Sequence, residues 1–212
     1  STRVSHSQSL VELNDREKIE LKPYEKNIAK NVMMPGNAIK RHVVVEERIN
    51  KLRELSEKSS LNKVEMNGSK IGVITSGISY MYAKEALGNS VNYLKLGIVY
   101  PLCEDLIKKF CAECETVYVV EELDNYIEKH TKALGLNVIG KEVFTLLGEY
   151  TPAMIKKAVL KEDSAPSIEI EEQIPVRPPV MCPGCPHRGV FYVLKKLGLT
   201  VSGDIGCYTL GA

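Results

Sequence analysis

The sequence predicts an α/β protein: a Rossmann-like parallel sheet, followed by the start of a second α/β domain. The first observation is that short apolar segments alternate with helical segments four times within about 90 residues, the pattern of a parallel sheet covered by helices. The second is a proline-rich, acidic segment that breaks this alternation. The third is a new Gly- and Pro-rich segment at the C-terminal end, which carries three of the six cysteines.

Composition excludes several classes of protein. The 28 basic and 27 acidic residues leave a net charge of +1, which argues against a nucleic-acid-binding surface. No apolar run approaches the roughly 20 residues that span a bilayer, and no secretory signal is present, so no membrane partner is expected. Six cysteines in 212 residues are too few for a disulfide scaffold, and they favour a reducing, cytoplasmic setting. Because the chain begins at Ser1, we expect sequence to continue beyond both ends.

The N-terminal part divides into two segments. Residues 1–22 have no clear period and look like the tail of a domain whose body lies upstream. Residues 23–68 form a polar helical connector, in which one approximate helical face carries Val44, Val45, Ile49, Leu52 and Leu55.

Residues 69–162 form the predicted Rossmann-like domain. The Asn67-Gly68 turn precedes the first strand, Pro101 is expected in the first turn of a helix, and Thr151-Pro152 supplies an N-cap and a first helical residue. The expected elements are strand 71–77, helix 78–87, strand 91–97, helix 101–110, strand 116–124, helix 125–134, strand 136–140 and helix 152–159.

The rest of the chain is a linker and a new unit. Residues 163–179 are acidic, contain four prolines and read as a semi-extended linker. A second domain is expected to start at 180–212, with a strand, a loop, a helix and a turn.

Two segments of the first domain could carry chemistry, because ligands of a parallel sheet collect at the carboxyl ends of its strands. Thr75-Ser76-Gly77 ends one strand and opens a helix, which suits an anion but lacks the glycine spacing of a dinucleotide site. Glu121-Glu122-Leu123-Asp124 ends another strand, either as a solvated helix N-terminus or as a domain contact near a cofactor.

The cysteines fall into two groups. Cys103, Cys111 and Cys114 lie in or beside an amphipathic helix and are interpreted as small buried hydrophobic residues. Cys182 and Cys185 share the tight loop "CPGC", and Cys207 follows in a "GDIGC" turn. Three sites are compatible with this second group: a redox dithiol, a zinc site completed by His187, or an iron–sulfur cluster with a fourth cysteine beyond Ala212. Spacing alone does not separate zinc from a cluster.

These motifs carry a family resemblance that runs the length of the chain. "RPPVMCPGCPHRGVFYVLKK" and "GDIGCYTLG" resemble the start of the thiamine-diphosphate-binding domain in large (alpha) subunits of indolepyruvate:ferredoxin oxidoreductases. Those enzymes belong to the 2-oxoacid:ferredoxin oxidoreductase superfamily. "IGVITSGISYMYAKEAL" and "VYVVEELDNYIE" resemble the transketolase C-terminal-like domain of the same subunit, and "TRVSHS" resembles the end of its pyrimidine-binding domain.

The resemblance implies an enzyme that decarboxylates an aryl 2-oxoacid oxidatively to an acyl-CoA. It implies thiamine diphosphate, Mg²⁺ and [4Fe–4S] clusters as cofactors. It also implies a small (beta) subunit, ferredoxin, the 2-oxoacid and coenzyme A as partners. Two alternatives from other classes are a non-catalytic α/β assembly subunit and a zinc-stapled binding module.

The resemblance also implies roles for individual residues. The diphosphate would lie near Gly184, with His187 and Arg188 close to the phosphates or the substrate carboxylate, and Asp204 and Gly206 would face the same pocket. By comparison with related oxidoreductases, Cys182, Cys185 and Cys207 either ligate the proximal cluster or line the cofactor pocket. The Gly-Asp-Gly…Asn motif that holds magnesium is absent from these residues, and the glutamate that activates the cofactor is expected upstream of Ser1. The 212 residues alone are therefore expected to be inactive.

Overall fold

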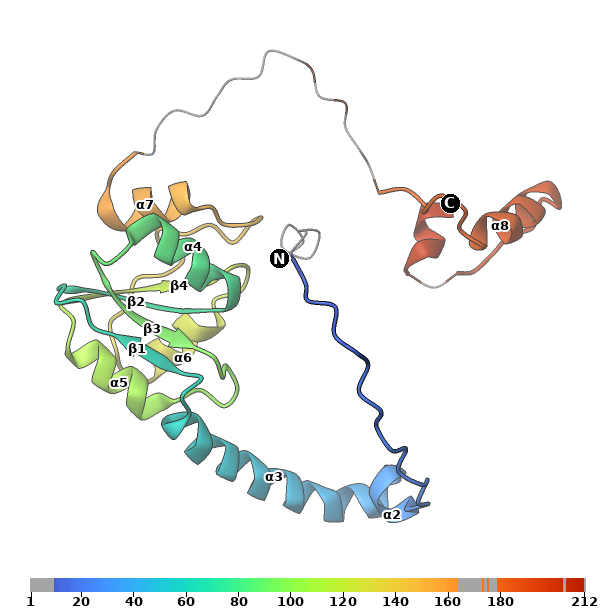
Figure 1. The fold of residues 1–212 in the computed structure, drawn as a ribbon, viewed down its shortest axis with the longest axis horizontal. Coiled ribbons are helices and arrows are strands. Elements are labelled where there is room, and N and C mark those ends of the chain that lie inside the picture. Colours follow the sequence, from blue (N-terminus) through green and yellow to red (C-terminus); the bar gives the residue numbers. More distant parts are fainter. Residues whose placement is uncertain (1–9, 164–172, 174, 176–178, 204, 212) are drawn as a thin grey trace. The chain divides into compact units, whose positions relative to one another are not determined.

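The protein has the predicted α/β architecture. The computed structural model describes residues 10–163, 173, 175, 179–203 and 205–211 (Figure 1). By its internal contacts the chain divides into two compact units, Ser1–Ala165 and Pro166–Ala212, and each is described by itself. The first unit contains a four-stranded, mostly parallel sheet covered by helices.

The sheet has the strand order β1-β3-β2-β4. The central strand β2 runs parallel to both β3 and β4, and β1 pairs antiparallel with β3 at the edge. Three of the four predicted strands are confirmed in place. The strands are β1 Lys63–Glu65, β2 Ile71–Ser76, β3 Asn92–Leu96 and β4 Thr116–Val120.

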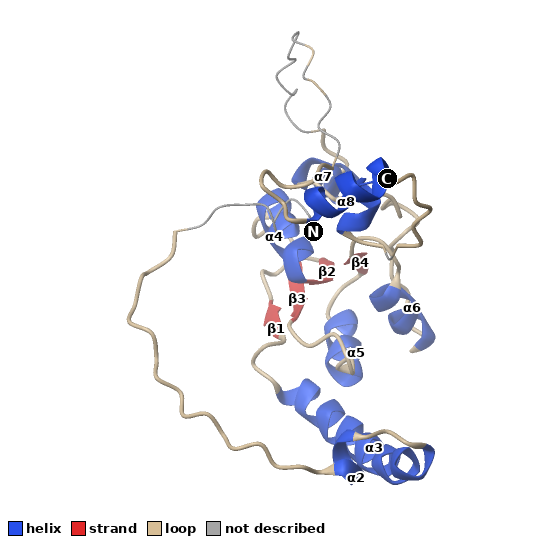
Figure 2. Ribbon diagram, turned by 90° about the vertical axis from the view of Figure 1, so that its right-hand side faces the viewer, coloured by secondary structure: helices blue, strands red, loops and turns tan. Residues whose placement is uncertain are grey.

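Both faces of the sheet are buried, because helices cover each of them (Figures 1 and 2). Helices α4 (Gly77–Leu87) and α7 (Pro152–Leu160) pack on the face that buries Val73. Helices α5 (Glu104–Ala112) and α6 (Tyr126–Ala133) pack on the face that buries the next residue, Ile74. The side chains of a strand alternate between faces, so every residue of the central strand segment meets a hydrophobic layer.

The predicted helical connector contains α2 (Ile28–Asn31) and α3 (Pro35–Lys58). Only Ser56 of α3 is buried, in agreement with its polar sequence. The end of α3 is attached to the sheet unit through the carboxylate of Glu57. Its two oxygens accept the N–H groups of Asp105 and Leu106, each at 3.0 Å, and thereby cap the start of α5.

The C-terminal unit contains α8 (His187–Lys196) and the 3₁₀ helix η1 (Cys207–Gly211). The two contact each other, and neither contains a buried residue. In neither described unit is any helix both long and apolar enough to cross a membrane.

The predicted strand 136–140 is wrong as a full strand. The structure has a single bridge there, in which the Val119 N–H donates to Ile139 O at 2.8 Å and the Ile139 N–H donates to Val117 O at 2.9 Å. The next N–H group, that of Gly140, donates to Glu142 Oε2 at 2.7 Å. This side-chain acceptor turns the chain away from β4 and ends the pairing.

The expected position of Pro101 is also wrong. Helix α5 begins at Glu104, and Pro101 lies before it, after a cis peptide bond. The first turn of the helix is set by the capping carboxylate of Glu57, which is nearly 50 residues away in sequence. That long-range contact has no local sequence signal.

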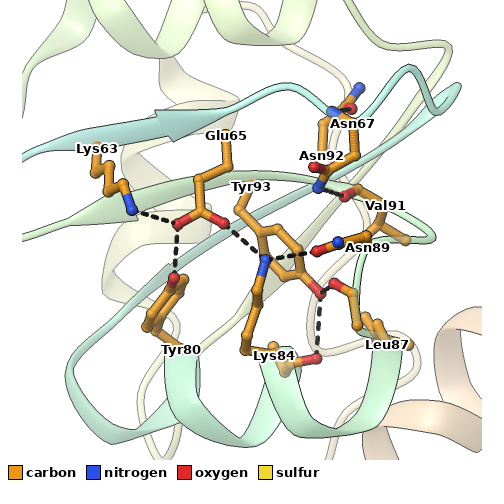
Figure 3. A network of polar contacts seen from close by, with 12 residues as sticks. Lys63, Glu65, Asn67, Tyr80, Lys84, Leu87, Asn89, Val91, Asn92 and Tyr93 are labelled. Carbon is orange, nitrogen blue, oxygen red and sulfur yellow. Dashed lines mark hydrogen bonds and ion pairs between the residues drawn. The ribbon is translucent and has the colours of Figure 1, made fainter.

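Strand β1 was not predicted, and it is held by a network of polar side chains around Glu65 (Figure 3). Glu65 Oε2 accepts from Lys84 Nζ of α4 at 2.7 Å. Its other oxygen accepts from the Tyr80 hydroxyl at 2.7 Å and lies 3.1 Å from Lys63 Nζ. These donors lower the pKa of Glu65 to about 2. The carboxylate therefore ties the edge strand to the helix above it.

We predict that this network makes stability depend on pH. The folded pKa of Glu65 is depressed, so its contribution is present above the unfolded value of 4.5 and is lost as pH falls towards about 2. Glu65→Gln should lower the free energy of unfolding by about 1 to 2 kcal/mol at pH 7 and by much less near pH 2. Urea unfolding at both pH values measures this difference, and an equal loss at both would contradict it.

A second prediction concerns Asn62, a buried residue between α3 and the sheet. Its Oδ1 accepts the N–H groups of Gly97 and Ile98, both at 2.9 Å, and its Nδ2 donates to Ser56 O at 2.8 Å. Asn62→Ala should destabilise the fold by about 2 to 3 kcal/mol, because it leaves these groups without partners. Asn62→Asp, which keeps the acceptor, should cost less. Chemical denaturation of both variants measures the order, and the reverse order would contradict this role.

Candidate functional site

The carboxyl ends of β2, β3 and β4 lie at one edge of the sheet, since the three strands are parallel. The connection from β2 to β3 passes through α4 on one face, and the connection from β3 to β4 passes through α5 on the other. The chain therefore switches direction between β2 and β4. In open α/β sheets, this switch point is the usual place for a ligand.

The switch point is bordered by Thr75-Ser76-Gly77. The hydroxyl of Thr75 is buried and donates to Val120 O at 2.8 Å, which ties the ends of β2 and β4 together. Ser76 precedes α4 and makes no side-chain cap hydrogen bond, while Gly77 has a φ of 53°. The anion site predicted on this segment remains a prediction.

The acidic segment after β4 is not a solvated helix terminus throughout, as one interpretation expected. Glu121 is buried, and its two carboxylate oxygens accept the N–H groups of Ile127 at 2.8 Å and Glu128 at 2.9 Å. Burial raises the pKa of Glu121. Glu122 accepts the Tyr150 N–H at 2.8 Å, and only Asp124 agrees with the solvated interpretation. The first two carboxylates accept backbone N–H groups.

Lys141 and Tyr150 complete this region, and sequence reasoning missed both. Lys141 Nζ donates to Glu121 O at 2.5 Å and to the Tyr150 hydroxyl at 2.7 Å. Burial raises the pKa of Tyr150 to about 12 and lowers that of Lys141. No motif marks these residues, because their partners come from separate segments of the chain.

The cysteines of the first unit pack as predicted. Cys103 is fully buried, and Cys111 and Cys114 lie partly buried against the core on the α5 and α6 side. Burial raises the pKa of Cys103 and of Cys111 to about 11. These two thiols are protonated near neutral pH and are poor metal ligands in this state.

The "CPGC" loop of the second unit is a tight turn. The Cys185 N–H donates to Cys182 O at 3.2 Å, and Gly184 has a φ of 72°. Proline at the second position, as Pro183, and glycine at the third are typical of a type II turn. The loop therefore fixes the backbone positions of Cys182 and Cys185.

Two predicted cofactor-binding residues contact this loop, and their roles at a cofactor stay predictions. Arg188 Nη2 donates to Met181 O at 2.9 Å, and its Nε lies 3.4 Å from Cys182 O. His187 Nδ1 lies 3.3 Å from Cys185 Sγ. The His187 ring stacks on Phe191 and meets Tyr208 edge to face, with centroid distances of 6.0 and 5.4 Å.

The third cysteine lies at the start of η1 and is exposed. Before it, the Gly206 N–H lies 3.4 Å from Thr209 Oγ1, and Asp204 lies outside the described residues. Among the residues with described positions, no three His, Cys, Asp or Glu side chains are placed to hold a metal. Cys182, Cys185 and Cys207 are thus not gathered into a metal-binding group within the described part of the chain. Their ligation of a cluster stays a prediction.

A concavity of about 740 Å³ lies within the second unit, between α8 and the segment that follows it. Its lining is mainly apolar and includes Phe191, Leu194, Val201, Ile205 and Tyr208. None of the three cysteines lines it. The pocket and the thiol loop share only the aromatic group around His187.

Comparisons with known proteins agree on one group of relatives. No family model matches the chain. The indolepyruvate oxidoreductase subunit IorA of Archaeoglobus fulgidus is 33% identical over 99% of this chain, and that of Methanothermobacter thermautotrophicus is 37% identical over 100% of it. In each case the chain spans 38% of the relative's length.

One solved structure is also similar, the 2-oxoglutarate:ferredoxin oxidoreductase of Magnetococcus marinus with 2-oxoglutarate, coenzyme A and succinyl-CoA bound. It is 22% identical, has a TM-score of 0.47, and the match covers 61% of this chain and 24% of that one. The sequence relatives are consistent with the resemblance found in the motifs, and they extend over essentially every residue. The chain belongs to the family of indolepyruvate oxidoreductase IorA subunits.

Proposed function

We propose that the chain is part of a thiamine-diphosphate-dependent 2-oxoacid:ferredoxin oxidoreductase that converts indolepyruvate or another aryl pyruvate to its acyl-CoA. The observation that carries this proposal is the identity of 33 to 37% to IorA subunits across the whole chain. A small (beta) subunit, ferredoxin, the 2-oxoacid and coenzyme A are the proposed partners, and the cytoplasm is the proposed location.

The domain assignment forms part of the proposal. Residues 69–162 would be the transketolase C-terminal-like domain, and 180–212 would begin the thiamine-diphosphate-binding domain. Residues 1–22 would end a pyrimidine-binding domain, 23–68 would connect the two, and 163–179 would be the linker. The mostly parallel sheet and the long polar helix α3 are consistent with the roles of 69–162 and 23–68.

The described residues of the second unit fit a diphosphate in one respect. Helix α8 has ten residues, and its first turn carries no side-chain cap and no acidic residue, so an anion can approach its N–H groups. The N–H groups near Gly184 and His187 are the proposed contacts. When bound, thiamine diphosphate would supply the electron sink for decarboxylation. The magnesium ligands are not assigned within these residues.

The iron–sulfur assignment has less structural support. The three thiols of Cys182, Cys185 and Cys207 do not form one group in the part of the second unit that the structure describes. Their assignment as cluster ligands stays a prediction. Zinc at this loop, with no iron or sulfide, would favour the binding-module alternative.

We predict activity only for the complete enzyme. The full-length protein, purified without oxygen together with its small subunit, should reduce ferredoxin when given indolepyruvate, coenzyme A and thiamine diphosphate. Omitting thiamine diphosphate from cofactor-depleted enzyme should abolish this reduction. The 212-residue chain alone should show no thiamine-dependent decarboxylation. Turnover by that chain alone, or a complete enzyme indifferent to thiamine diphosphate, would overturn the proposal, and the second result would favour the assembly-subunit alternative.

A further prediction concerns metal content. If the three exposed or half-exposed thiols ligate a [4Fe–4S] cluster, Cys182→Ser in the full-length protein should remove about four iron atoms and the matching sulfide. Cys111→Ser, at a partly buried position in α5, is the matched control and should remove none. Equal iron in both variants would show that the thiols of the loop do not ligate a cluster.

Arg188 is proposed to position the loop, because its guanidinium group contacts two loop carbonyls. Arg188→Gln should loosen the turn and increase the alkylation rate of the half-buried Cys185 several-fold. Lys196→Gln, on the same helix, removes an equal charge without touching the loop. Peptide mass spectrometry after a short iodoacetamide pulse measures both variants. An unchanged Cys185 rate in Arg188→Gln would refute the positioning role.

A further inference from the structure

The strongest unexplained feature of the first unit is the start of helix α4 at the switch point of the sheet. Helix α4 has eleven residues and contacts both β2 and β4, the two strands that border the switch point. Its first turn has no side-chain cap and no acidic residue. A helix start of this kind offers N–H groups and a positive dipole end to an anion.

A second, independent observation is the hydroxyl of Ser79. The residue is only 4% exposed, yet no hydrogen-bond partner for its hydroxyl is found among the described residues. Every fully enclosed side-chain N or O atom in those residues does have a partner. The Ser79 oxygen is therefore not sealed in the core, and it must reach an opening through which a ligand or solvent atom can approach it.

The direction of that opening follows from helix geometry. Ser79 is the third residue of α4 and belongs to the buried face with Ala83 and Leu87, which packs on the sheet. Side chains of a helix lean towards its N-terminus. We therefore expect the hydroxyl of Ser79 to face the start of α4. The half-exposed Ser76 at that place also has no cap hydrogen bond.

The carboxylates of Glu121 and Glu122 repel an anion at the start of α4 less strongly than two free carboxylates would. Both oxygens of Glu121 are held by N–H groups of α6, and Glu122 is held by the Tyr150 N–H. Their negative charges are partly compensated by these donors and by Lys141. These two acids contact the start of α6 and the Tyr150 N–H, whereas the first turn of α4 has no side-chain cap.

From this geometry we infer that the start of α4 is a binding subsite for the phosphate group of a small ligand, held by first-turn N–H groups and by the hydroxyls of Ser76 and Ser79. A phosphate suits the site because its several acceptor oxygens can take N–H and O–H donors at once. The inference does not depend on the proposed thiamine chemistry, which concerns the other unit.

The test uses the full-length protein, saturated with thiamine diphosphate so that any diphosphate site is occupied. Calorimetric titration with inorganic phosphate should detect binding, and Ser79→Ala should weaken it about fivefold to tenfold, the loss expected for one hydrogen bond to a charged ligand. Ser79→Asp should abolish it by repulsion. Acetate, which has fewer acceptor oxygens, should bind much more weakly than phosphate.

The control variant is Ser90→Ala. Ser90 follows the same helix and donates to Leu87 O, so its loss should leave phosphate affinity unchanged. If Ser79→Ala perturbs folding, Ser76→Ala at a half-exposed position gives the same test without altering the core. Phosphate affinity unchanged in Ser79→Asp and Ser76→Ala would overturn the proposal. So would the absence of phosphate binding at millimolar concentration, or acetate binding as tight as that of phosphate.

Discussion

The fold of the first unit depends on the burial of β2 on both faces and along both edges. This strand pairs in parallel with β3 and β4, and its side chains alternate between the two hydrophobic layers. Parallel pairing requires crossover connections, and right-handed crossovers to opposite sides of one strand place helices on opposite faces. The switch point between β2 and β4 is therefore a consequence of how the core is buried. The position of this switch point is set by the strand order and the crossovers, and it does not depend on a ligand.

The loops at this edge are kept in place by polar side chains that act over long distances in the sequence. Glu121 caps α6, Glu57 caps α5, and Asn62 holds the chain after β3. Each supplies an acceptor to N–H groups that a helix start or strand end leaves without a partner. A buried carboxylate in this role resembles a catalytic acid in its raised pKa, as Glu121 shows. Its hydrogen bonds distinguish the two, because both of its oxygens are already used.

The sequence was sufficient to predict elements whose burial is complete and whose signals are local. Strands β2 and β4 are rich in apolar and β-branched residues, and four of the five residues of β3 are buried. The Thr151-Pro152 start of α7 is confirmed, with Thr151 Oγ1 accepting the Met154 N–H at 3.3 Å. The errors arose where a distant side chain decides the local structure. Strand β1 has one apolar residue in three and depends on Glu65, and the pairing with β4 ends after Ile139 because Glu142 accepts the N–H group of Gly140.

The candidate sites divide in the same way. The "CPGC" loop was predictable in position and turn type, since Pro183 and Gly184 specify the turn locally. The side chains that converge around the loop were not predictable, because the polar groups of His187 and Arg188 contact the loop itself. At the edge of the sheet the sequence drew attention to the acidic segment as much as to Thr75-Ser76-Gly77. The structure separates them by a single criterion, whether the polar groups already have protein partners. The oxygens of Glu121 do, and the hydroxyl of Ser79 has none among the described residues, so the capacity to bind a ligand at this edge lies with α4.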